Sequence, residues 1–412
     1  MRTPDDWGRR VLACASTGAY PQLSWLDGGP RGRSVVGLSP AQEVRSDDLA
    51  VVSDLPSGYW LGWLTYEAGV DATLGRTPRS RALPGVCLRR FDGLLAWGPA
   101  GIEHLGDPAA AAAIERQLQS APPWSPGAWP LQRLRSDVEP AEYRRRVEAV
   151  LKEIRAGNTY QVNLSQPFRA SFTEAAAGQP WPHNVAALYH GLRSDTPAPL
   201  GGLLFDGNRA LVSNAPETLV HWEGGVVTSS PIKGTRPRGA TPGEDRANVD
   251  ALLASHKDAA EHVMIVDLVR NDLGRIAAAG SVVASGRPEL VTLPTVHHLV
   301  TDVHARLADG LGLGALLAAL FPGGSITGAP KIATLGIIER LETVPRGLYC
   351  GGLVLITPER VSVNIAIRSG QCDEDGLTVH GGGGIVLDSD PEGERLESIA
   401  KVRAFDRAGD YQ

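Results

Sequence analysis

The clearest hydrophobic pattern in the chain begins at residue 140 and predicts an amphipathic helix. Apolar side chains recur there every three or four positions, the spacing of one helix face: Tyr143, Val147, Val150, Leu151 and Ile154. Pro140 suits the first turn of a helix, and Gly157 is typical of the position just after a helix end. A strand is expected to follow at residues 159–168.

Short apolar runs predict strands on both sides of this helix. The N-terminal runs are GYWLGWLTYEAG (58–69) and CLRRFDGLLAW (87–97). Four short runs between residues 199 and 230 are separated by Asp206-Gly207-Asn208 and Gly224-Gly225, which predicts one antiparallel meander. Further strands are expected at 351–356, 361–368, 377–380 and 384–388.

Additional helices are expected at about 244–254, 257–272 and 391–405, with a glycine-rich loop and helix at 323–340. Antiparallel strands interrupted by helices predict an α+β fold, built of large layered antiparallel sheets with flanking helices. Residues 106–130 hold an alanine run and then a proline-rich stretch, which fits either a linker or a surface loop. We therefore expect an N-terminal region at 1–125 and a catalytic domain at 138–405, intertwined in one globule.

Composition and charge narrow the class of protein. The chain is 42% hydrophobic and 21% charged, as in globular proteins, and its net charge of −6 gives no general reason to bind nucleic acid or an anionic membrane. The sequence has neither a signal peptide nor a long apolar window. Its four scattered cysteines are typical of reduced thiols. We expect a cytoplasmic protein.

Two helices carry acidic residues at a spacing that could bind a metal ion. Asp258 and Glu261 share a face of one helix, and Glu394, Glu397 and Lys401 form a stripe on another. Carboxylates facing one another would repel unless a cation lay between them, and oxygen ligands without His or Cys favour Mg²⁺. The alternative is two solvated helix faces.

Two glycine-rich segments could bind anions. VHGGGGIVLD (379–388) places four glycines between two expected strands, where backbone N–H groups could hold a carboxylate. FPGGSITGAPK (321–331) precedes a helix but is not a P-loop, because Ala329 and Pro330 stand where the lysine should be. Tight turns are the alternative for both segments.

Two cationic residues have positions at which they could bind a carboxylate or act as a nucleophile. Arg368 ends the run VSVNIAIRS, where it could grip a carboxylate bidentately or form a structural salt bridge. Lys233 stands between an expected strand and a glycine in SSPIKGTRPRG. If desolvated, its amine becomes a nucleophile. Otherwise it is a surface charge.

Together these segments resemble the chorismate-utilising enzymes: anthranilate synthase, aminodeoxychorismate synthase and isochorismate synthase. The resemblance covers residues 138–405 and rests on ordered motifs: GNTYQVNLSQPF, SNAPETLV, PIKGTRPR, AAEHVMIVDLVRNDLGRI, VHHLVT, FPGGSITGAPK, NIAIRSG and GGGGIVLDSD. It implies an anthranilate synthase component I-like fold.

Two positions discriminate within this class. Isochorismate synthases carry a lysine base where Gln161 stands, and anthranilate synthases usually have alanine where Lys233 stands. PIKGT is similar to aminodeoxychorismate synthases, which implies amination of chorismate at carbon 4 to 4-amino-4-deoxychorismate, a precursor of 4-aminobenzoate and folate. The alternative is an anthranilate synthase component I, which aminates carbon 2 and releases pyruvate.

The resemblance also implies roles for individual residues. Lys233 is expected as the nucleophile and Glu217 as the general acid, with Gln161 and His298 at further catalytic positions. The expected substrate-binding residues are Arg368, Lys401, Gly382, Gly384 and Ser325. Mg²⁺ is expected on Glu261 and Glu397, with Asp258 and Glu394 acting through water.

The ammonia is expected to come from outside this chain. None of the cysteines, Cys14, Cys87, Cys350 and Cys372, lies in a GxCxG nucleophile elbow. A separate glutamine amidotransferase subunit, or ammonia from solution, is therefore expected as the partner. Ala215 and Ser362 depart from the Ser and Asp that relatives often have there. LSWLDGG (23–29) only loosely matches a strand that can hold tryptophan in the family, so tryptophan regulation is not expected.

Overall fold

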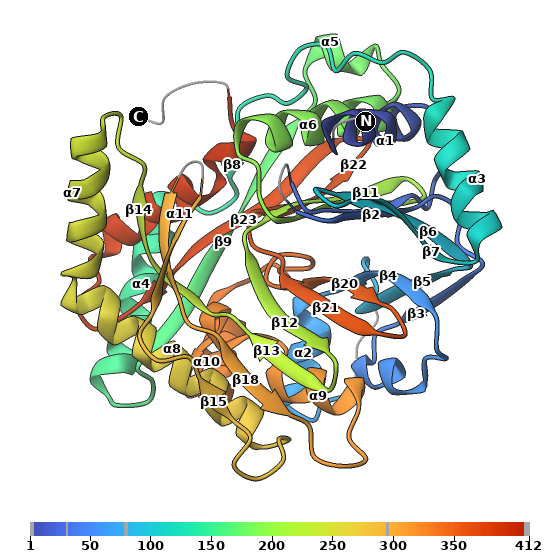
Figure 1. The fold of residues 1–412 in the computed structure, drawn as a ribbon. Coiled ribbons are helices and arrows are strands. Elements are labelled where there is room, and N and C mark those ends of the chain that lie inside the picture. Colours follow the sequence, from blue (N-terminus) through green and yellow to red (C-terminus); the bar gives the residue numbers. More distant parts are fainter. Residues whose placement is uncertain (1–3, 30–31, 78–80, 294–295, 408–412) are drawn as a thin grey trace.

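The computed structural model describes residues 4–29, 32–77, 81–293 and 296–407, and they form four layers (Figure 1). Two large antiparallel sheets face each other, with helices packed on both outer faces. Helices α1, α3 and α6 cover one sheet, and helices α2, α8 and α9 cover the other. The predicted α+β fold with layered antiparallel sheets is confirmed.

The first sheet has eleven strands in the described residues. In spatial order they are β19 (Gly328–Ala329), β9 (Gln161–Ser171), β23 (Gly376–Ile385), β22 (Ser369–Asp373), β11 (Arg209–Ala215), β10 (Leu200–Asp206), β1 (Ser24–Asp27), β2 (Ser34–Gly37), β6 (Gly93–Gly98) and β7 (Gly101–Gly106), with β8 (Arg135–Ser136) beside β9.

Within the described ranges the second sheet has nine strands, and a small third sheet has three. The second sheet runs β15 (Val283–Ala284), β18 (Val303–Arg306), β13 (Val226–Ser229), β12 (Glu217–Glu223), β21 (Arg360–Ile365), β20 (Gly352–Ile356), β4 (Tyr59–Leu64), β5 (Val86–Phe91) and β3 (Gln42–Ser46). The third runs β14 (Ile232–Pro237), β17 (Val296–Val300) and β16 (Glu289–Thr292).

The helices lie mainly outside these sheets. They are α1 (Pro4–Ser16), α2 (Tyr66–Thr73), α3 (Pro108–Gln119), α4 (Pro140–Arg155), α5 (Glu174–Ala177), α6 (Trp181–Asp195), α7 (Pro242–Leu253), α8 (His256–Gly274), α9 (Leu313–Leu320), α10 (Lys331–Leu341) and α11 (Pro391–Val402). In the described part of the chain, none combines the length and the apolar character that a bilayer crossing requires.

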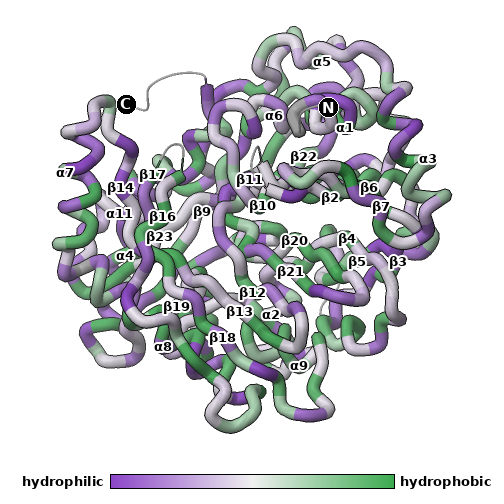
Figure 2. Tube along the Cα trace, viewed as in Figure 1, coloured by the Kyte–Doolittle hydropathy of each residue, from purple (hydrophilic) through white to green (hydrophobic). Residues whose placement is uncertain are grey.

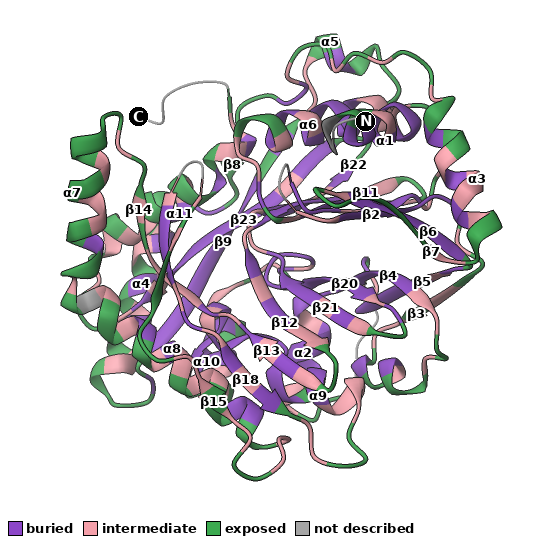
Figure 3. Cartoon of the chain, in the orientation of Figure 1, coloured by how far each residue is buried: buried purple, intermediate pink, exposed green. Residues whose placement is uncertain are grey.

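The core between the two sheets is built from alternate residues of their facing strands. Trp63 of β4, Leu204 of β10 and Leu353 of β20 pack together there and are almost fully buried. Figure 2 shows the hydrophobic positions along these inner strands, and Figure 3 shows that the same strands are buried. Side chains that alternate between two faces allow each strand to serve this core and an outer helix layer.

Strands from the N-terminal region complete both large sheets. β1 pairs with β10 in the first sheet, and β4 pairs with β20 in the second. The alanine run within 106–130 is not a linker, because it forms α3, which packs Ala111, Ile114 and Leu118 into the core. The division at residues 125 and 138 stays a prediction.

The predicted meander at 199–230 is wrong, because its strands belong to two sheets. β10 and β11 pair in the first sheet, whereas β12 and β13 pair in the second. The chain crosses between the sheets at Pro216, which has no backbone N–H to contribute to a continuous ladder. Glu217 is therefore the first residue after a crossing.

A second crossing runs beside the first in the opposite direction. β21 ends at Ile365, earlier than predicted, and Arg368 lies between β21 and β22 with a left-handed φ of 51°. The N–H of Asn214 donates to the carbonyl oxygen of Arg368 at 2.9 Å, so the two crossings are hydrogen-bonded together. Glu217 and Arg368 consequently lie at one seam between the sheets.

Two further expectations about local structure are wrong. The glycines at 381–384 do not form a loop between two strands, because they lie inside the continuous strand β23, which pairs with β9 along its whole length. The run at 58–69 is a strand only to Leu64, after which Tyr66 begins α2. In both places tertiary pairing outweighs local propensity.

A buried arginine ties α2 to the segment that follows α10. The guanidinium of Arg346 donates to both carboxylate oxygens of Glu342, and it lies 4.5 Å from the ring centroid of Tyr66. Only 1% of the Arg346 side chain is exposed. Glu67 of α2 accepts hydrogen bonds from the backbone N–H groups of Arg346 and Gly347. This network stabilises the structure next to the seam at which Glu217 and Arg368 lie.

We predict that Arg346→Ala lowers the free energy of unfolding by about 3–5 kcal/mol, because it leaves the Glu342 carboxylate buried without its partner. Arg340→Ala is the matched control, since Arg340 pairs with Glu153 while 61% of its side chain is exposed. It should cost at most about 1 kcal/mol. Urea unfolding followed by tryptophan fluorescence measures both, and equal losses would contradict this description.

Candidate active site

A pocket of about 580 Å³ opens at the seam between the sheets. Its wall combines residues of α8, α11, β12, β14, β17 and β23 with the two chain crossings. The predicted site residues that line it are Lys233, Glu217, His298, Ser325, Arg368, Lys401, Gly382, Gly384, Asp258, Glu261, Glu394 and Glu397. Segments from Asn163 to Lys401 thus meet in one cavity.

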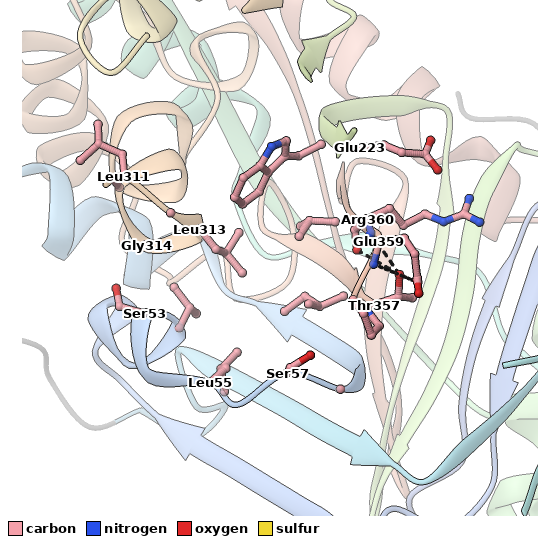
Figure 4. A pocket seen from close by; sticks show the side chains of 18 of the residues that line it. Ser53, Leu55, Ser57, Glu223, Leu311, Leu313, Gly314, Thr357, Glu359 and Arg360 are labelled. Atoms are coloured by element: carbon pink, nitrogen blue, oxygen red, sulfur yellow. Dashed lines mark hydrogen bonds between the residues drawn. The ribbon is translucent and has the colours of Figure 1, made fainter. Parts of the chain in front are cut away.

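A larger cavity of about 850 Å³ lies among turns at the end of the second sheet. Figure 4 shows its lining, in which Thr357 forms hydrogen bonds with Glu359 and Arg360 within a single turn. Apart from such rim residues its lining is mainly apolar or glycine. Since nothing in it converges for acid–base chemistry, we place the candidate site in the smaller pocket.

Glu217 is a buried carboxyl group with a strongly shifted pKa. Only 6% of the residue is exposed, and burial raises its pKa to about 7. The Ser325 hydroxyl donates to Glu217 Oε1 at 3.1 Å, and the nearby Lys233 ammonium opposes the shift. A carboxyl group that titrates near neutral pH can carry a proton to a leaving group.

Lys233 lies in the same pocket, and burial lowers its pKa despite the nearby Glu261 carboxylate. Its position depends on a bulge in the pairing of β14 with β17, between Lys233 and Thr235. Gly234 forms the bulge with φ of 70°, a conformation that glycine adopts readily. A Cβ atom added at Gly234 would also press on Leu252, 2.8 Å away. The bulge thus sets the position of the Lys233 side chain, and burial lowers the pKa of its amine.

His298 lies beside Lys233 in this small sheet. Its Nδ1 is hydrogen-bonded to the hydroxyl of Thr235 at 2.9 Å, and burial lowers its pKa. Its Nε2 is buried and has no hydrogen-bond partner in the described part of the chain. The neutral ring therefore presents one nitrogen that a ligand could use.

Arg368 faces the pocket from the second crossing. Burial lowers the pKa of its guanidinium, and no carboxylate among the described residues offsets that effect. This favours the ligand-binding alternative over the structural salt bridge, because a buried cation requires an anion.

The edge of β23 presents backbone donors to the pocket. The N–H of Asn163 donates to Thr327 and the N–H of Ser165 donates to Glu342, so neither bonds the residue opposite it on β23. Those residues are Gly384 and Gly382. In an antiparallel ladder such pairs point their N–H groups away from each other. Both glycine amides therefore point away from β9, toward the opposite edge of β23. On that edge β22 does not pair with β23 beyond Val379, so β22 does not cover these amides.

The four carboxylates predicted to bind metal reach the pocket from α8 and α11. Glu394 and Glu397 lie over Gly383, where an added Cβ atom would be 2.9 Å and 3.4 Å from their oxygens. Asp258 accepts a hydrogen bond from Arg236 at 2.8 Å, and Glu397 pairs with Lys401 at 2.9 Å. This oxygen-only donor set fits a hard divalent cation.

A tight cluster of ligand atoms occurs elsewhere. In the described residues, the only set of three acidic, Cys or His groups with ligand atoms within 4.8 Å of one another is Glu43, Cys87 and Asp206. Arg89 forms ion pairs with both carboxylates of this set, at 2.7 Å and 2.8 Å. We interpret it as a charge network, because a buried cation already occupies its centre. The four pocket carboxylates are more widely separated.

Gln161 is the predicted site residue that does not line the pocket. It lies behind Gly384, where an added Cβ atom would be 3.1 Å from the Gln161 amide carbon. The residue is 1% exposed, and neither its amide oxygen nor its amide nitrogen has a partner in the part of the chain that the structure describes.

The pocket wall also includes Asn163, Arg236, Tyr349 and His380, which the sequence analysis did not single out. Alternation along β9 and β23 could have indicated two of them, since Asn163 shares a face with Gln161, and His380 shares one with Gly382. Tyr349 follows a turn and carries no comparable pattern.

Comparison with known proteins supports these observations. The model of the family described as chorismate binding enzyme matches residues 29–407. Aminodeoxychorismate synthase component 1 of Salmonella typhimurium is 37% identical over 363 residues, covering 85% of this chain and 76% of that protein. Anthranilate synthase component 1 1 of Haloarcula marismortui is 36% identical over 381 residues, covering 85% of this chain and 75% of that protein.

A solved structure agrees with the fold as well. Anthranilate synthase component I from Streptococcus pneumoniae superposes with a TM-score of 0.76 at 26% sequence identity, covering 92% of this chain and 93% of that one. The resemblance to chorismate-utilising enzymes is confirmed. Since relatives of similar identity carry two names, identity alone does not choose between their reactions.

We predict that Glu217→Gln stabilises the protein at high pH. Ionising the buried carboxyl group costs folding free energy as the pH rises from about 4.5 through about 7, and glutamine escapes that cost. The variant should be more stable than the parent by about 3 kcal/mol at pH 9 and nearly equal to it at pH 4.

Urea unfolding at both pH values measures this difference. Glu223→Gln is the matched control at the exposed end of the same strand, where His221 lowers the pKa of Glu223. It should not gain stability as the pH rises. A Glu217→Gln difference that stays constant with pH would show that the carboxyl group is not held protonated by burial.

Proposed function

We propose that this chain, which belongs to the family of chorismate-binding enzymes, aminates chorismate at carbon 4 to give 4-amino-4-deoxychorismate. The observation that supports the proposal most strongly is the pair formed by Lys233 and Glu217 in one pocket. Burial shifts their pKa values in opposite directions, toward a neutral amine and a protonated acid. That is the pair of protonation states that displacement of a hydroxyl group by an amine requires.

The first step would form a covalent intermediate. The nitrogen of Lys233 forms a bond to carbon 2 of the ring, the two ring double bonds shift, and the bond between carbon 4 and its hydroxyl oxygen breaks. Glu217 gives its proton to that oxygen, which leaves as water. Ser325, which donates a hydrogen bond to Glu217, would hold the carboxyl group toward carbon 4.

The second step would release the amine. Ammonia forms a bond to carbon 4, the double bonds return, and the bond between carbon 2 and Lys233 breaks. Because the first step leaves the lysine nitrogen as a secondary ammonium, it departs as the neutral amine without taking up a proton. The proton that the new ammonium on carbon 4 loses restores the Glu217 carboxyl group. His298, which is neutral and hydrogen-bonded to Thr235, is positioned beside Lys233 to relay such a proton.

The dianionic substrate would be held by cationic and N–H groups. Arg368, Lys401 and the amides of Gly382 and Gly384 line the pocket and can bind carboxylates. Glu261 and Glu397 would hold a Mg²⁺ ion, with Asp258 and Glu394 contacting its water ligands. When bound, this ion supplies positive charge that orients the ring carboxylate and withdraws electrons from the ring.

Gln161 bears on which nucleophile is used. A glutamine amide cannot accept a proton at neutral pH, so it cannot activate water at carbon 2 as a lysine base would. This favours amination over hydration of chorismate. The ammonia would come from a separate glutamine amidotransferase subunit or from solution, and the cytoplasm is the proposed location.

The rival function is amination at carbon 2 with release of pyruvate, as expected of an anthranilate synthase component I. Similarity to anthranilate synthases supports it, and Lys233 argues against it because carbon 2 would be occupied by the lysine when ammonia adds. Incubation with chorismate, Mg²⁺ and ammonium separates the two. We expect 4-aminobenzoate to form only after a separate lyase is added, whereas immediate anthranilate fluorescence would establish the rival.

We predict that Lys233→Ala abolishes amination at carbon 4, lowering its rate by more than about a thousandfold, because the covalent route is lost. Any residual product should include anthranilate. Lys152→Ala on the exposed face of α4 is the control and should leave the rate unchanged. Chromatography of the products measures both variants, and normal carbon 4 amination by Lys233→Ala would refute the nucleophile.

A further inference from the structure

His380 lines the pocket but has no part in the steps above. It lies on β23 and is 4% exposed. Because side chains alternate along a strand, His380 shares a face with Gly382 and Gly384, which carry no side chain there. The imidazole is thus the only side chain that β23 presents on this face between residues 380 and 384.

A stack of rings fixes the orientation of His380. Its imidazole lies parallel to the ring of Tyr349, with centroids 5.6 Å apart and planes inclined by 14°. The guanidinium of Arg346 lies 5.8 Å from the centroid of Tyr349 and 4.5 Å from that of Tyr66. The stack therefore extends from the N-terminal region, through the buried arginine, to the pocket.

The surroundings keep this imidazole neutral. Burial and the nearby Arg346 charge lower the pKa of His380 to about 3. Its Nε2 is buried and has no hydrogen-bond partner in the described residues. An unpartnered polar atom in such a site costs folding free energy, so its retention calls for a ligand that completes the bond.

We propose that Nε2 of His380 donates a hydrogen bond to a carboxylate oxygen of bound chorismate. The N–H of Gly382, two residues along the same strand, points away from β9 toward the same cavity. The two residues lie about 7 Å apart along the strand backbone, and together they offer a side-chain donor and a main-chain donor to one anionic ligand. A neutral donor adds such a bond without adding a charge to a pocket that already contains lysine and arginine.

This inference rests on the proposed function only in requiring that chorismate occupies the pocket. It makes His380 a residue that contacts the substrate. The competing explanation is that His380 serves only the stack on Tyr349. The two explanations differ in which property of the ring matters: its nitrogen or its flat aromatic face.

Two substitutions separate these properties. His380→Phe keeps a ring on Tyr349 and removes the nitrogen, and His380→Gln keeps an N–H donor and removes the ring. We expect His380→Phe to raise KM for chorismate about 10- to 100-fold, the usual effect of losing a hydrogen bond to a charged group, and to change kcat less. His380→Gln should recover part of that loss.

Chorismate consumption with Mg²⁺ and ammonium gives KM and kcat, and thermal unfolding with and without chorismate gives binding independently. His380→Phe should unfold at the same temperature as the parent or higher without substrate, but show a smaller upward shift when chorismate is added. His183→Phe, which alters a histidine of α6 bonded to Trp124, is the control and should change neither KM nor the shift.

The inference is overturned if His380→Phe keeps the parental KM and chorismate shift, or if His380→Gln binds chorismate more weakly than His380→Phe. Neither the consumption of chorismate nor its binding depends on which carbon is aminated. If the product were anthranilate, the proposed reaction would fail while the role of His380 could still be confirmed.

Discussion

The candidate active site depends on two backbone crossings that are hydrogen-bonded to each other between the large sheets. The bond from Asn214 to the carbonyl of Arg368 fixes one crossing against the other. Because β11 pairs with β22 and β12 pairs with β21, both segments change sheets at the same level. The acid Glu217 and the cation Arg368 follow from this arrangement, since each occupies one crossing.

Burial at this seam raises the pKa of an acidic group and lowers the pKa of a basic group. The same loss of water that favours a protonated Glu217 favours a deprotonated Lys233. In water Glu217 would be an ionised carboxylate and Lys233 a protonated ammonium. Neither state serves the proposed chemistry, which needs an acid and a neutral amine. The Glu261 and Glu397 carboxylates raise the pKa of Lys233, but the larger effect of burial leaves that pKa below its ordinary value.

Much of this site could be predicted from the sequence, and the misses have physical causes. The helix from Pro140, the acidic faces of α8 and α11 and the layered fold follow from local periodicity. The split of the expected meander at Pro216 does not, because strand runs look alike whichever sheet they join. β23 was missed as a continuous strand because its four glycines have poor intrinsic strand propensity, which pairing with β9 overrides. Alternation along β23 could have indicated His380, but its stacking on Tyr349 could not be predicted, because Tyr349 is distant in sequence.

The covalent bond between Lys233 and the ring is the central claim, and mass spectrometry of the protein tests it most directly. Enzyme incubated with chorismate and Mg²⁺ in the absence of ammonia, then denatured and digested, should yield the peptide containing Lys233 with the added mass of chorismate less one water. Glu217→Gln, which lacks the acid, should yield much less of this adduct. An unmodified Lys233 in enzyme that forms the carbon 4 product once ammonium is added would contradict the account.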